Sequence, residues 1–543
     1  MGQSTFMRGA LILAVAGAII KALGAVFRIP LGNMIGDGGM GYYQAAYTIY
    51  VMFLVVSNSG IPVAISRMVS ERTALGNPRS AHRVFRVSFI LMLLIGLASF
   101  AICFFGTDIL LSRFPNMGGA AWSVKAIAPA LFIVPIMASF RGYFQGRQNM
   151  RPTANSQVME QLFRVVTGLS LAWLLLPSGK ERAAAGAASG AAVGAAFGLL
   201  TIVIIYMLNR KRIHRGIRND QGDTIEPAGS ILIKIFTIAI PITIGAAIMP
   251  IMNFIDLAFI TNRLSAIGWA AEAVNNVYGR FTGFANPLIN LPQILTQAVA
   301  MSLVPAVAAA FKRKDTEFLQ LNIKLGLRTA IIIGLPCAFG MMVLSQEILL
   351  VLYPSEREAA LGAAPFLFIL AFGIIFLSMV QTLTGVLQGV GRQLIPVRNL
   401  FIGAAGKIAV TWTLLAVPSI NVKGAALGTV TAYIIASTLN LAAVSKYTGT
   451  KFDIKLTFAK PLLSAAVMGA TVWLSFHGLS RVLGLVSASR FVSFILPTLL
   501  SIGLGAVVYV IMILACGAIT KSEIGQLPFG DKLLKLLSRT PFS

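Results

Sequence analysis

Long apolar stretches separated by short polar segments make up almost the whole chain. Apolar runs of about twenty residues are long enough to cross the hydrocarbon core of a bilayer as α-helices. We find fourteen such runs, and each predicts a membrane-spanning helix. Their approximate bounds are 6–29, 42–66, 84–108, 124–146, 153–176, 186–209, 230–255, 277–304, 323–349, 361–388, 396–417, 424–445, 459–479 and 491–517. The first run is too long for a signal peptide, so we expect it to remain as the first membrane helix.

Basic residues gather in every second polar segment. They follow the second, fourth, sixth, eighth and twelfth runs, for example in segments 67–86 and 210–218. Cytoplasmic loops are enriched in Lys and Arg, so this alternation predicts that both termini lie in the cytoplasm. Arg67 and Arg141 are interpreted as anchors of the same kind.

The composition agrees with a polytopic membrane protein. Of the 543 residues, 57% are hydrophobic and 11% are charged, and the mean hydropathy is +0.82. A soluble domain would have about a quarter of its residues charged. The net charge of +26 would indicate nucleic-acid binding in a soluble chain, but here the membrane topology explains it, and we expect no nucleic-acid partner.

Other classes of function find little support in the sequence. Cys103, Cys337 and Cys516 lie singly in apolar runs, which predicts neither a disulfide framework nor a metal site. The glycine-rich segment 36–41 lies between two predicted membrane helices and predicts a turn rather than a nucleotide-binding loop. We therefore expect no enzymatic activity, no catalytic residue and no cofactor. Segment 532–539 predicts either a short interfacial helix or a loose tail.

Five short motifs of the first half recur in the same order in the second half, 236 to 244 residues further on. The matching segments are 63–66 with 299–302, 109–115 with 348–354, 128–133 with 364–369, 142–146 with 385–389, and 152–155 with 396–399. The duplication predicts two six-helix lobes, 1–220 and 221–450, followed by a helix pair and a cytoplasmic tail in 451–543. Six crossings is an even number, so both lobes insert with the same orientation. This architecture is typical of a transporter, although a duplicated structural bundle would give the same pattern.

Two cations lie within the first apolar run. A cation at the centre of a membrane helix costs roughly 2.5–3.5 kcal/mol on insertion scales. Lys21 and Arg28 are seven residues apart and project from nearly the same helical face. We expect this face to line an internal aqueous cavity. Arg28 has the alternative of extending its side chain to the membrane interface.

Further charges fall within or near the ends of other apolar runs. They are Asp37, Glu160, Arg164, Asp256, Arg263, Arg280 and Lys407. Glu160 and Arg164 are four residues apart and predict an ion pair along one helix. Asp256 is a candidate ion or proton site, or a partner for Lys21. Asp37 and Lys407 are candidates for ion coupling or pairing, and Arg280 opens the eighth helix.

Cations outnumber acids among the candidates for the cavity. This balance favours an anionic substrate, and Arg in particular suits phosphate, which it can bind with two parallel hydrogen bonds. An exporter of cations or cationic drugs would need the opposite balance.

Several motifs resemble one branch of the multidrug/oligosaccharidyl-lipid/polysaccharide (MOP) exporter superfamily. They are Lys21-x-x-Gly24-x-x-x-Arg28-Ile-Pro, the turn 35–43, segment 59–67 and Ser302-Leu-Val-Pro305. The branch contains stage V sporulation protein B, polysaccharide-biosynthesis proteins and lipid II flippases of the MurJ kind. The resemblance implies a fourteen-helix fold like that of MATE and MurJ proteins in a bacterial cytoplasmic membrane. It also implies that the last two helices form a groove for a polyprenyl chain with the C-terminal lobe.

MurJ-type flippases carry essential cations in the first, second and eighth helices. Lys21 and Arg28 match the first pair approximately, and Arg280 matches the eighth-helix arginine through its Tyr-x-Arg context. We expect these three to bind substrate. The second-helix arginine has no counterpart, since segment 47–56 contains no cation.

The resemblance implies that the protein flips a polyprenyl-pyrophosphate-linked precursor, lipid II or a related lipid-linked oligosaccharide, from the inner to the outer leaflet. Its partners would then be the lipid-linked anionic oligosaccharide and membrane lipid. Three alternatives stay open. One is an antiporter of the MATE type coupled to Na⁺ or H⁺, and another is a non-transporting scaffold for envelope or spore assembly. The third is a flippase whose cargo is a capsule or teichoic precursor.

Overall fold

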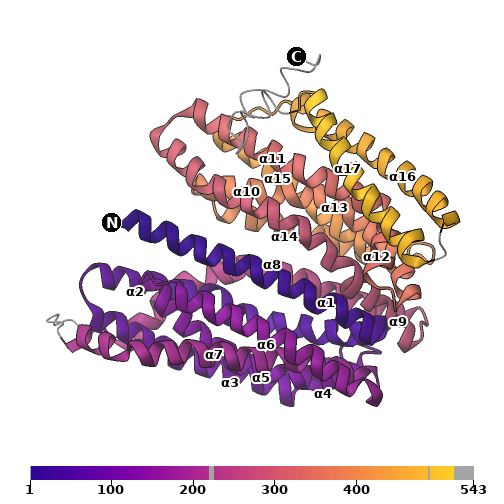
Figure 1. Cartoon of the computed structure of the whole chain (residues 1–543). Helices are drawn as coiled ribbons and strands as arrows, with labels where there is room; N and C mark the ends of the chain where they lie inside the picture. The colour runs from indigo at the N-terminus through magenta and orange to yellow at the C-terminus, as the bar shows by residue number, and fades with distance from the viewer. Residues whose placement is uncertain (1, 219–225, 487–488, 519–543) are drawn as a thin grey trace. The chain divides into compact units, whose positions relative to one another are not determined.

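The computed structural model of the protein describes residues 2–218, 226–486 and 489–518, and the regular structure in these ranges is entirely helical (Figure 1). Two compact units are present. The first comprises the described parts of 1–283 and 353–359, and the second those of 284–352 and 360–543.

The first unit contains nine α-helices within the described ranges. They are α1 (Gly2–Val55), α2 (Ile61–Ala74), α3 (Pro78–Phe105), α4 (Thr107–Leu111), α5 (Ala121–Gly146), α6 (Arg151–Leu175), α7 (Lys180–Arg218), α8 (Ala228–Ala266) and α9 (Ala271–Gly279). The helices of the second unit are α10 (Asn286–Arg313), α11 (Thr316–Val343), α12 (Ser345–Leu352), most of α13 (Arg357–Gly389), α14 (Leu394–Leu415), α15 (Lys423–Thr448), α16 (Lys460–Val486) and α17 (Leu496–Ala515).

The prediction of an all-α polytopic membrane protein is confirmed. By length and composition, 13 helices of the described residues could cross a membrane. Twelve of them correspond one to one with the third to fourteenth predicted runs. The first, Val15–Ala74, is 60 residues long and contains most of the first predicted helix and all of the second.

The two predicted helices within Val15–Ala74 are separated by a reversal at Gly36. A straight helix of this length would measure about 90 Å, three times the thickness of the hydrocarbon core. Gly36 has φ 66° and ψ −171°, a conformation that essentially only glycine adopts. The chain turns back there, and α2 consequently lies at the same end of the unit as the N-terminus (Figure 1). The predicted turn at 36–41 is thus a break at one residue, with buried helix on both sides.

Irregular turns interrupt the second and eighth predicted helices. The π-helical segment η1 (Val56–Gly60) joins the second part of α1 to α2, and η4 (Arg280–Ala285) joins α9 to α10. Such π-turns occur frequently at functional sites. A Cβ atom on Gly60 would lie 2.2 Å from the carbonyl oxygen of Ala239, so the glycine allows α8 to approach η1 closely.

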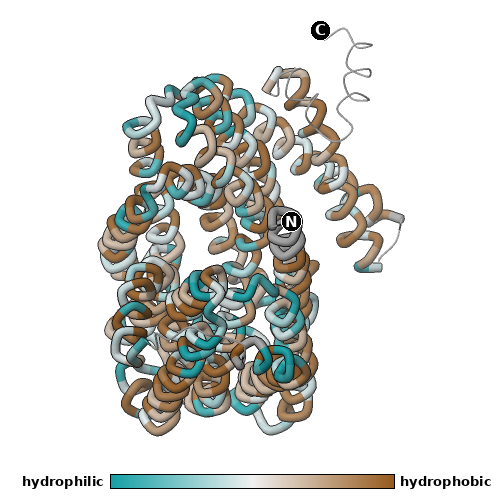
Figure 2. Tube along the Cα trace, turned by 90° about the vertical axis from the view of Figure 1, so that its left-hand side faces the viewer, coloured by the Kyte–Doolittle hydropathy of each residue, from teal (hydrophilic) through white to brown (hydrophobic). Residues whose placement is uncertain are grey.

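Apolar side chains cover much of the outside of the helices. Phe105, Trp173 and Ile233 of the first unit are all exposed, and Figure 2 shows hydrophobic residues along the length of the helices, interspersed with polar positions. An outer surface of this kind suits contact with lipid. Which side of the membrane the termini face stays a prediction.

The compact units do not divide where the sequence duplication does. The predicted lobe boundary lies at 220/221, whereas the units separate at 283/284, because α8 packs against α1 and α2, and α9 packs against α1. The division into 1–220, 221–450 and 451–543 therefore stays a prediction about the repeats. In the second unit, α16 and α17 pack on each other and on α11, where Tyr509 donates a hydrogen bond to the carbonyl of Ile332 at 2.7 Å. Segment 532–539 lies outside the described residues.

A polar cluster lies where α8 begins. Glu226 accepts hydrogen bonds from Arg72 of α2, from Lys234 and, at 3.0 Å, from Ser230. Partial burial disfavours the carboxylate, but the hydrogen bonds from Lys234 and Arg72 outweigh it and lower the pKa of Glu226 from 4.5 to about 2. The cluster therefore ties the end of α2 to the start of α8.

Substituting Gly36 should destabilise the protein. We expect Gly36→Ala to lower the free energy of unfolding by about 1–3 kcal/mol, because alanine is strained in this conformation. The new Cβ would also lie 3.0 Å from the carboxylate of Glu356. Thermal unfolding of the purified protein measures the effect. The matched control is Gly17→Ala in the same helix, where no atom lies within 4 Å and a small gain is expected. Equal effects of the two variants would contradict the assignment of the reversal to Gly36.

The Glu226 cluster should make stability depend on pH in the acid range. Because the folded pKa of Glu226 lies below 4.5, the carboxylate stabilises the protein above about pH 4.5, and this contribution is lost as the pH falls toward about 2. Glu226→Gln should therefore lower Tm at pH 7, and the difference from wild type should shrink between pH 4.5 and 2. Exposed Glu317 provides the control, since Glu317→Gln should show no such convergence.

Candidate functional site: cations beside the first helix hairpin

The two cations of the first predicted helix lie before the reversal in α1. Arg28 is eight residues from Gly36, which corresponds to about 12 Å along a helix. Its side chain is half-buried, whereas Lys21 is exposed on the first unit. Within the described residues Arg28 forms no ion pair. Its charge acts on the phenol groups of Tyr47 and Tyr353.

Helix α6 packs lengthwise against α1 and carries Arg164 on the contacting side. A Cβ on Gly24 would lie 3.9 Å from the amide nitrogen of Gln161, and a Cβ on Gly168 would lie 2.8 Å from the ring of Phe27. Gln161, Arg164 and Gly168 are spaced by three and four residues, so they share one face of α6. Arg164 is therefore directed toward α1.

Arg164 is held by aromatic residues that follow the reversal. Its Nη2 donates a hydrogen bond to the hydroxyl of Tyr43 at 3.3 Å, and its Cζ lies 5.1 Å from the ring centroid of Tyr47. The Tyr43 and Tyr47 rings are stacked, with centroids 6.0 Å apart. Within the described parts of the chain, no carboxylate pairs with Arg164. A cation over a phenol ring gains about 0.5–2 kcal/mol but keeps its charge.

Arg164 also lies beside the part of the second predicted helix where the resemblance to MurJ-type flippases leads one to expect an arginine. Segment 47–56 contains no Lys or Arg. Helix α6 instead places the guanidinium of Arg164 over the ring of Tyr47, which belongs to that segment. Four-residue spacing alone predicts a pair of Arg164 with Glu160 and gives no sign of this contact. The spacing of Tyr43, Tyr47 and Tyr50 along one helical face was the signal that could have identified an aromatic surface there.

The predicted pair of Glu160 and Arg164 is wrong. Glu160 Oε2 instead accepts a hydrogen bond from Arg141 Nη2 at 2.8 Å, and Arg141 also donates to Ser156 at 2.7 Å. Arg141 is only 7% exposed, and its interpretation as a cytoplasmic anchor stays a prediction. Contacts between helices decide the pairing: Glu160 meets α5, whereas Arg164 meets α1.

A second ion pair lies next to the reversal in α1. Arg280 Nε donates to Asp37 Oδ2 at 2.6 Å, and Asp37 Oδ1 accepts from the backbone N–H of Gly38 at 2.8 Å. Asn275 donates to the carbonyl of Gly38 at 2.7 Å. A Cβ on Gly279 would lie 2.0 Å from the Asp37 carbonyl oxygen, so this glycine brings α9 onto α1. Arg280, expected to bind substrate, is thus already neutralised by Asp37.

Two further predicted charges are buried in separate units. Asp256 of α8 is 3% exposed, and its charge acts on Tyr278 of α9. Lys407 of α14 is 1% exposed in the second unit. Asn399 lies on the same helix and donates to Asn440 of α15 at 2.9 Å. The roles of Asp256 and Lys407 in ion coupling stay predictions.

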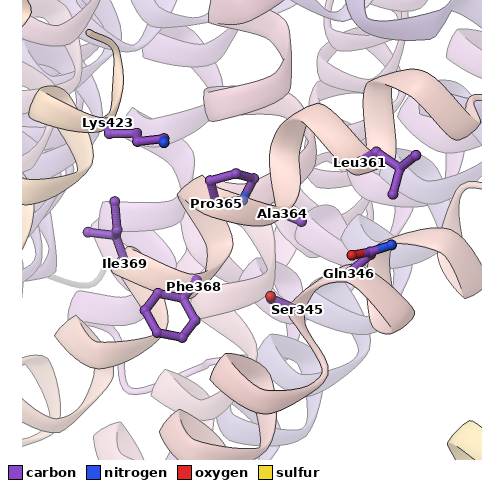
Figure 3. A pocket seen from close by; sticks show the side chains of 8 residues that line it. All are labelled: Ser345, Gln346, Leu361, Ala364, Pro365, Phe368, Ile369 and Lys423. Carbon is purple, nitrogen blue, oxygen red and sulfur yellow. The ribbon is translucent and has the colours of Figure 1, made fainter. Parts of the chain in front are cut away.

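A cavity of about 440 Å³ opens in the second unit, between α12, α13 and the start of α15 (Figure 3). Its lining residues are Ser345, Gln346, Leu361, Ala364, Pro365, Phe368, Ile369 and Lys423. The walls are mostly apolar, and the Lys423 side chain extends toward Pro365 (Figure 3). None of the predicted site residues lines this cavity, so the cationic positions of α1 and α6 remain the candidate site.

Comparison with known proteins shows the family. The family model "Polysaccharide biosynthesis protein" matches residues 6–311, more than half of the chain. The chain belongs to this family. The MatE family model also matches residues 241–413.

Two proteins of Bacillus subtilis (strain 168) are similar over most of their length. Stage V sporulation protein B is 28% identical over 537 residues, which cover 98% of this chain and 100% of that protein. The lipid II flippase MurJ is 27% identical over 484 residues, which cover 87% and 88%.

Solved structures show the same fold. An inward-facing MATE multidrug resistance transporter of the MOP superfamily superposes with a TM-score of 0.68 at 15% identity, covering 79% of this chain and 96% of that one. The lipid II flippase MurJ in an inward closed conformation gives a TM-score of 0.64 at 16% identity, covering 92% and 98%. The expected MOP superfamily membership and MATE/MurJ-like fold are confirmed, and the similar proteins include a lipid II flippase and a multidrug resistance transporter.

Breaking the Arg141–Glu160 pair should be costly. We expect Glu160→Gln to lower the free energy of unfolding by about 1–3 kcal/mol, because it leaves a buried guanidinium without its carboxylate. Denaturant or thermal unfolding measures the effect. The matched control is Glu71→Gln in the exposed Arg67–Glu71 pair at 2.9 Å, where a change of only about 0–1 kcal/mol is expected. Similar losses of unfolding free energy in both variants would show that the buried pair does not stabilise the fold more than the exposed pair does.

Proposed function

We propose that this MOP superfamily protein is a flippase for a polyprenyl-pyrophosphate-linked cell-wall precursor. The observation that carries the proposal is the pairing of charges in the first unit. Two of its membrane carboxylates are used by other cations, Asp37 by Arg280 and Glu160 by Arg141. Arg28 and Arg164 form no ion pair within the described residues.

Unneutralised cations at membrane depth favour an anionic ligand. Each such charge is costly in hydrocarbon, and a bound phosphate group would offset that cost. The planar guanidinium can donate two parallel hydrogen bonds to phosphate oxygens. The relatives support the same class of cargo, since one is named a lipid II flippase and the matching family is named for polysaccharide biosynthesis.

The proposed cycle uses alternating access. The pyrophosphate enters from the cytoplasmic leaflet and binds Lys21 and Arg28, while its lipid tail stays in the bilayer. Arg280 can join only when the anion displaces Asp37 from it. An inside-negative potential favours outward movement of the anion, by about 2.3 kcal/mol per charge and 100 mV for a full crossing.

A cation-coupled antiporter is the second candidate. The MatE match over 241–413 and the buried carboxylate of Asp256 favour it. In that mechanism Asp256 would bind Na⁺ or H⁺, and the cations of α1 would be secondary.

Reconstituted flipping of a polyprenyl-pyrophosphate-linked oligosaccharide separates the two candidates. We expect Arg28→Gln to reduce the flipping rate about tenfold or more, because the pyrophosphate loses a charged hydrogen-bond donor. Asp256→Asn should have the smaller effect, and exposed Arg113→Gln serves as the control. In cells, depletion should make the lipid-linked precursor accumulate on the cytoplasmic side. The opposite ranking of the variants, together with export of an organic cation, would establish the antiporter instead.

A further inference from the structure

We propose that Arg28 and Arg164 form a two-cation subsite for the diphosphate group beside Tyr47; this inference rests on the proposed function and names a binding residue for it. Sequence spacing assigned Arg164 to an ion pair. In the folded chain, Arg164 instead contacts Tyr43 and Tyr47.

The position of Arg164 is built by packing. Its face of α6 lies against α1, where Gly24 and Phe27 contact Gln161 and Gly168. Phe27 in turn lies 5.8 Å from the ring of Tyr43, which accepts the hydrogen bond of Arg164. A guanidinium fixed in this way loses little conformational freedom when a ligand binds.

The two cations lie near one phenol. Arg164 lies over the Tyr47 ring at 5.1 Å, and the charges of both Arg164 and Arg28 act on the Tyr47 hydroxyl. Like charges that converge on a partly buried position repel each other. The nearby Glu160 carboxylate is bound to Arg141, and that guanidinium offsets its charge. An anion between the two guanidinium groups would remove the repulsion.

The donors available fit a diphosphate better than a single phosphate. A guanidinium has five N–H donors, and the hydrogen bond to Tyr43 uses one of those of Arg164. Arg164 and Tyr47 are both half-buried, so a ligand can reach them from the surface of the first unit. Two arginines can each bind one phosphoryl group, and the Tyr47 hydroxyl can donate to either.

Equilibrium binding to the full-length protein in lipid nanodiscs tests the subsite. The probes are a polyprenyl pyrophosphate, the matching polyprenyl monophosphate and inorganic pyrophosphate as competitor. We expect Arg164→Gln to weaken binding of the polyprenyl pyrophosphate about tenfold or more and to reduce its preference over the monophosphate. Arg164→Lys should lie between this variant and wild type. Exposed Arg182→Gln is the control and should bind as wild type.

Tyr43→Phe provides a second variant that keeps every charge. It removes only the hydrogen bond that orients Arg164, so it should weaken diphosphate binding by a smaller factor and should fold even where Arg164→Gln does not. Competition by inorganic pyrophosphate that is lost in Arg164→Gln would support recognition of the diphosphate group itself.

Two results would overturn the subsite, and they differ from failure of the proposed function. Wild-type affinity and wild-type preference in Arg164→Gln, with loss of binding in Arg28→Gln, would make Arg164 a structural residue while the flippase function stands. Unchanged binding in Tyr43→Phe together with unchanged binding in Arg164→Lys would lead to the same conclusion. If the wild-type protein binds neither pyrophosphate probe but binds organic cations, the proposed function itself fails.

Discussion

Placing charge at membrane depth is the constraint on which the first unit depends. A charged side chain in hydrocarbon is expensive unless another group compensates it. The chain uses two kinds of compensation. Asp37 and Glu160 neutralise Arg280 and Arg141, whereas Arg164 rests on the neutral phenol groups of Tyr43 and Tyr47 and keeps its charge. The first kind stabilises helix contacts, and the second leaves positive charge available to a ligand.

One backbone reversal makes this arrangement possible. Gly36 turns the chain so that the residues on either side of it form two adjacent membrane crossings. Phe27, before the reversal, then lies 5.8 Å from Tyr43, after it. Since α6 packs against the first of these crossings, Arg164 reaches the aromatic face of the second. A family of transporters with different cargoes can share the fold, because the cargo depends on which charges such contacts leave without a counter-charge.

The helices could be predicted from sequence because the bilayer allows few alternatives. Backbone N–H and C=O groups must be satisfied within the membrane, so a long apolar run forms a helix whatever its neighbours are. The runs at 84–108 and 361–388, for example, correspond to α3 and α13. The glycine-rich segment 36–41 predicts a turn between two helices, and in the structure the reversal needs only Gly36, in a conformation that essentially only glycine adopts. The compact units also divide at 283/284, since α8 and α9 pack with helices that precede them in the chain.

The sequence by itself determined the class of protein, the membrane helices, the branch of the superfamily and the positions of the membrane charges. Only the tertiary structure decided how those charges are paired. In an isolated helix, four-residue spacing would stabilise a Glu160–Arg164 pair by about 0.2–0.5 kcal/mol. The rotation of α6 against α1 and α5 outweighs it, directing Glu160 to Arg141 and Arg164 to the tyrosines. Helix rotation arises from packing between segments far apart in the chain, and no spacing within one segment encodes it.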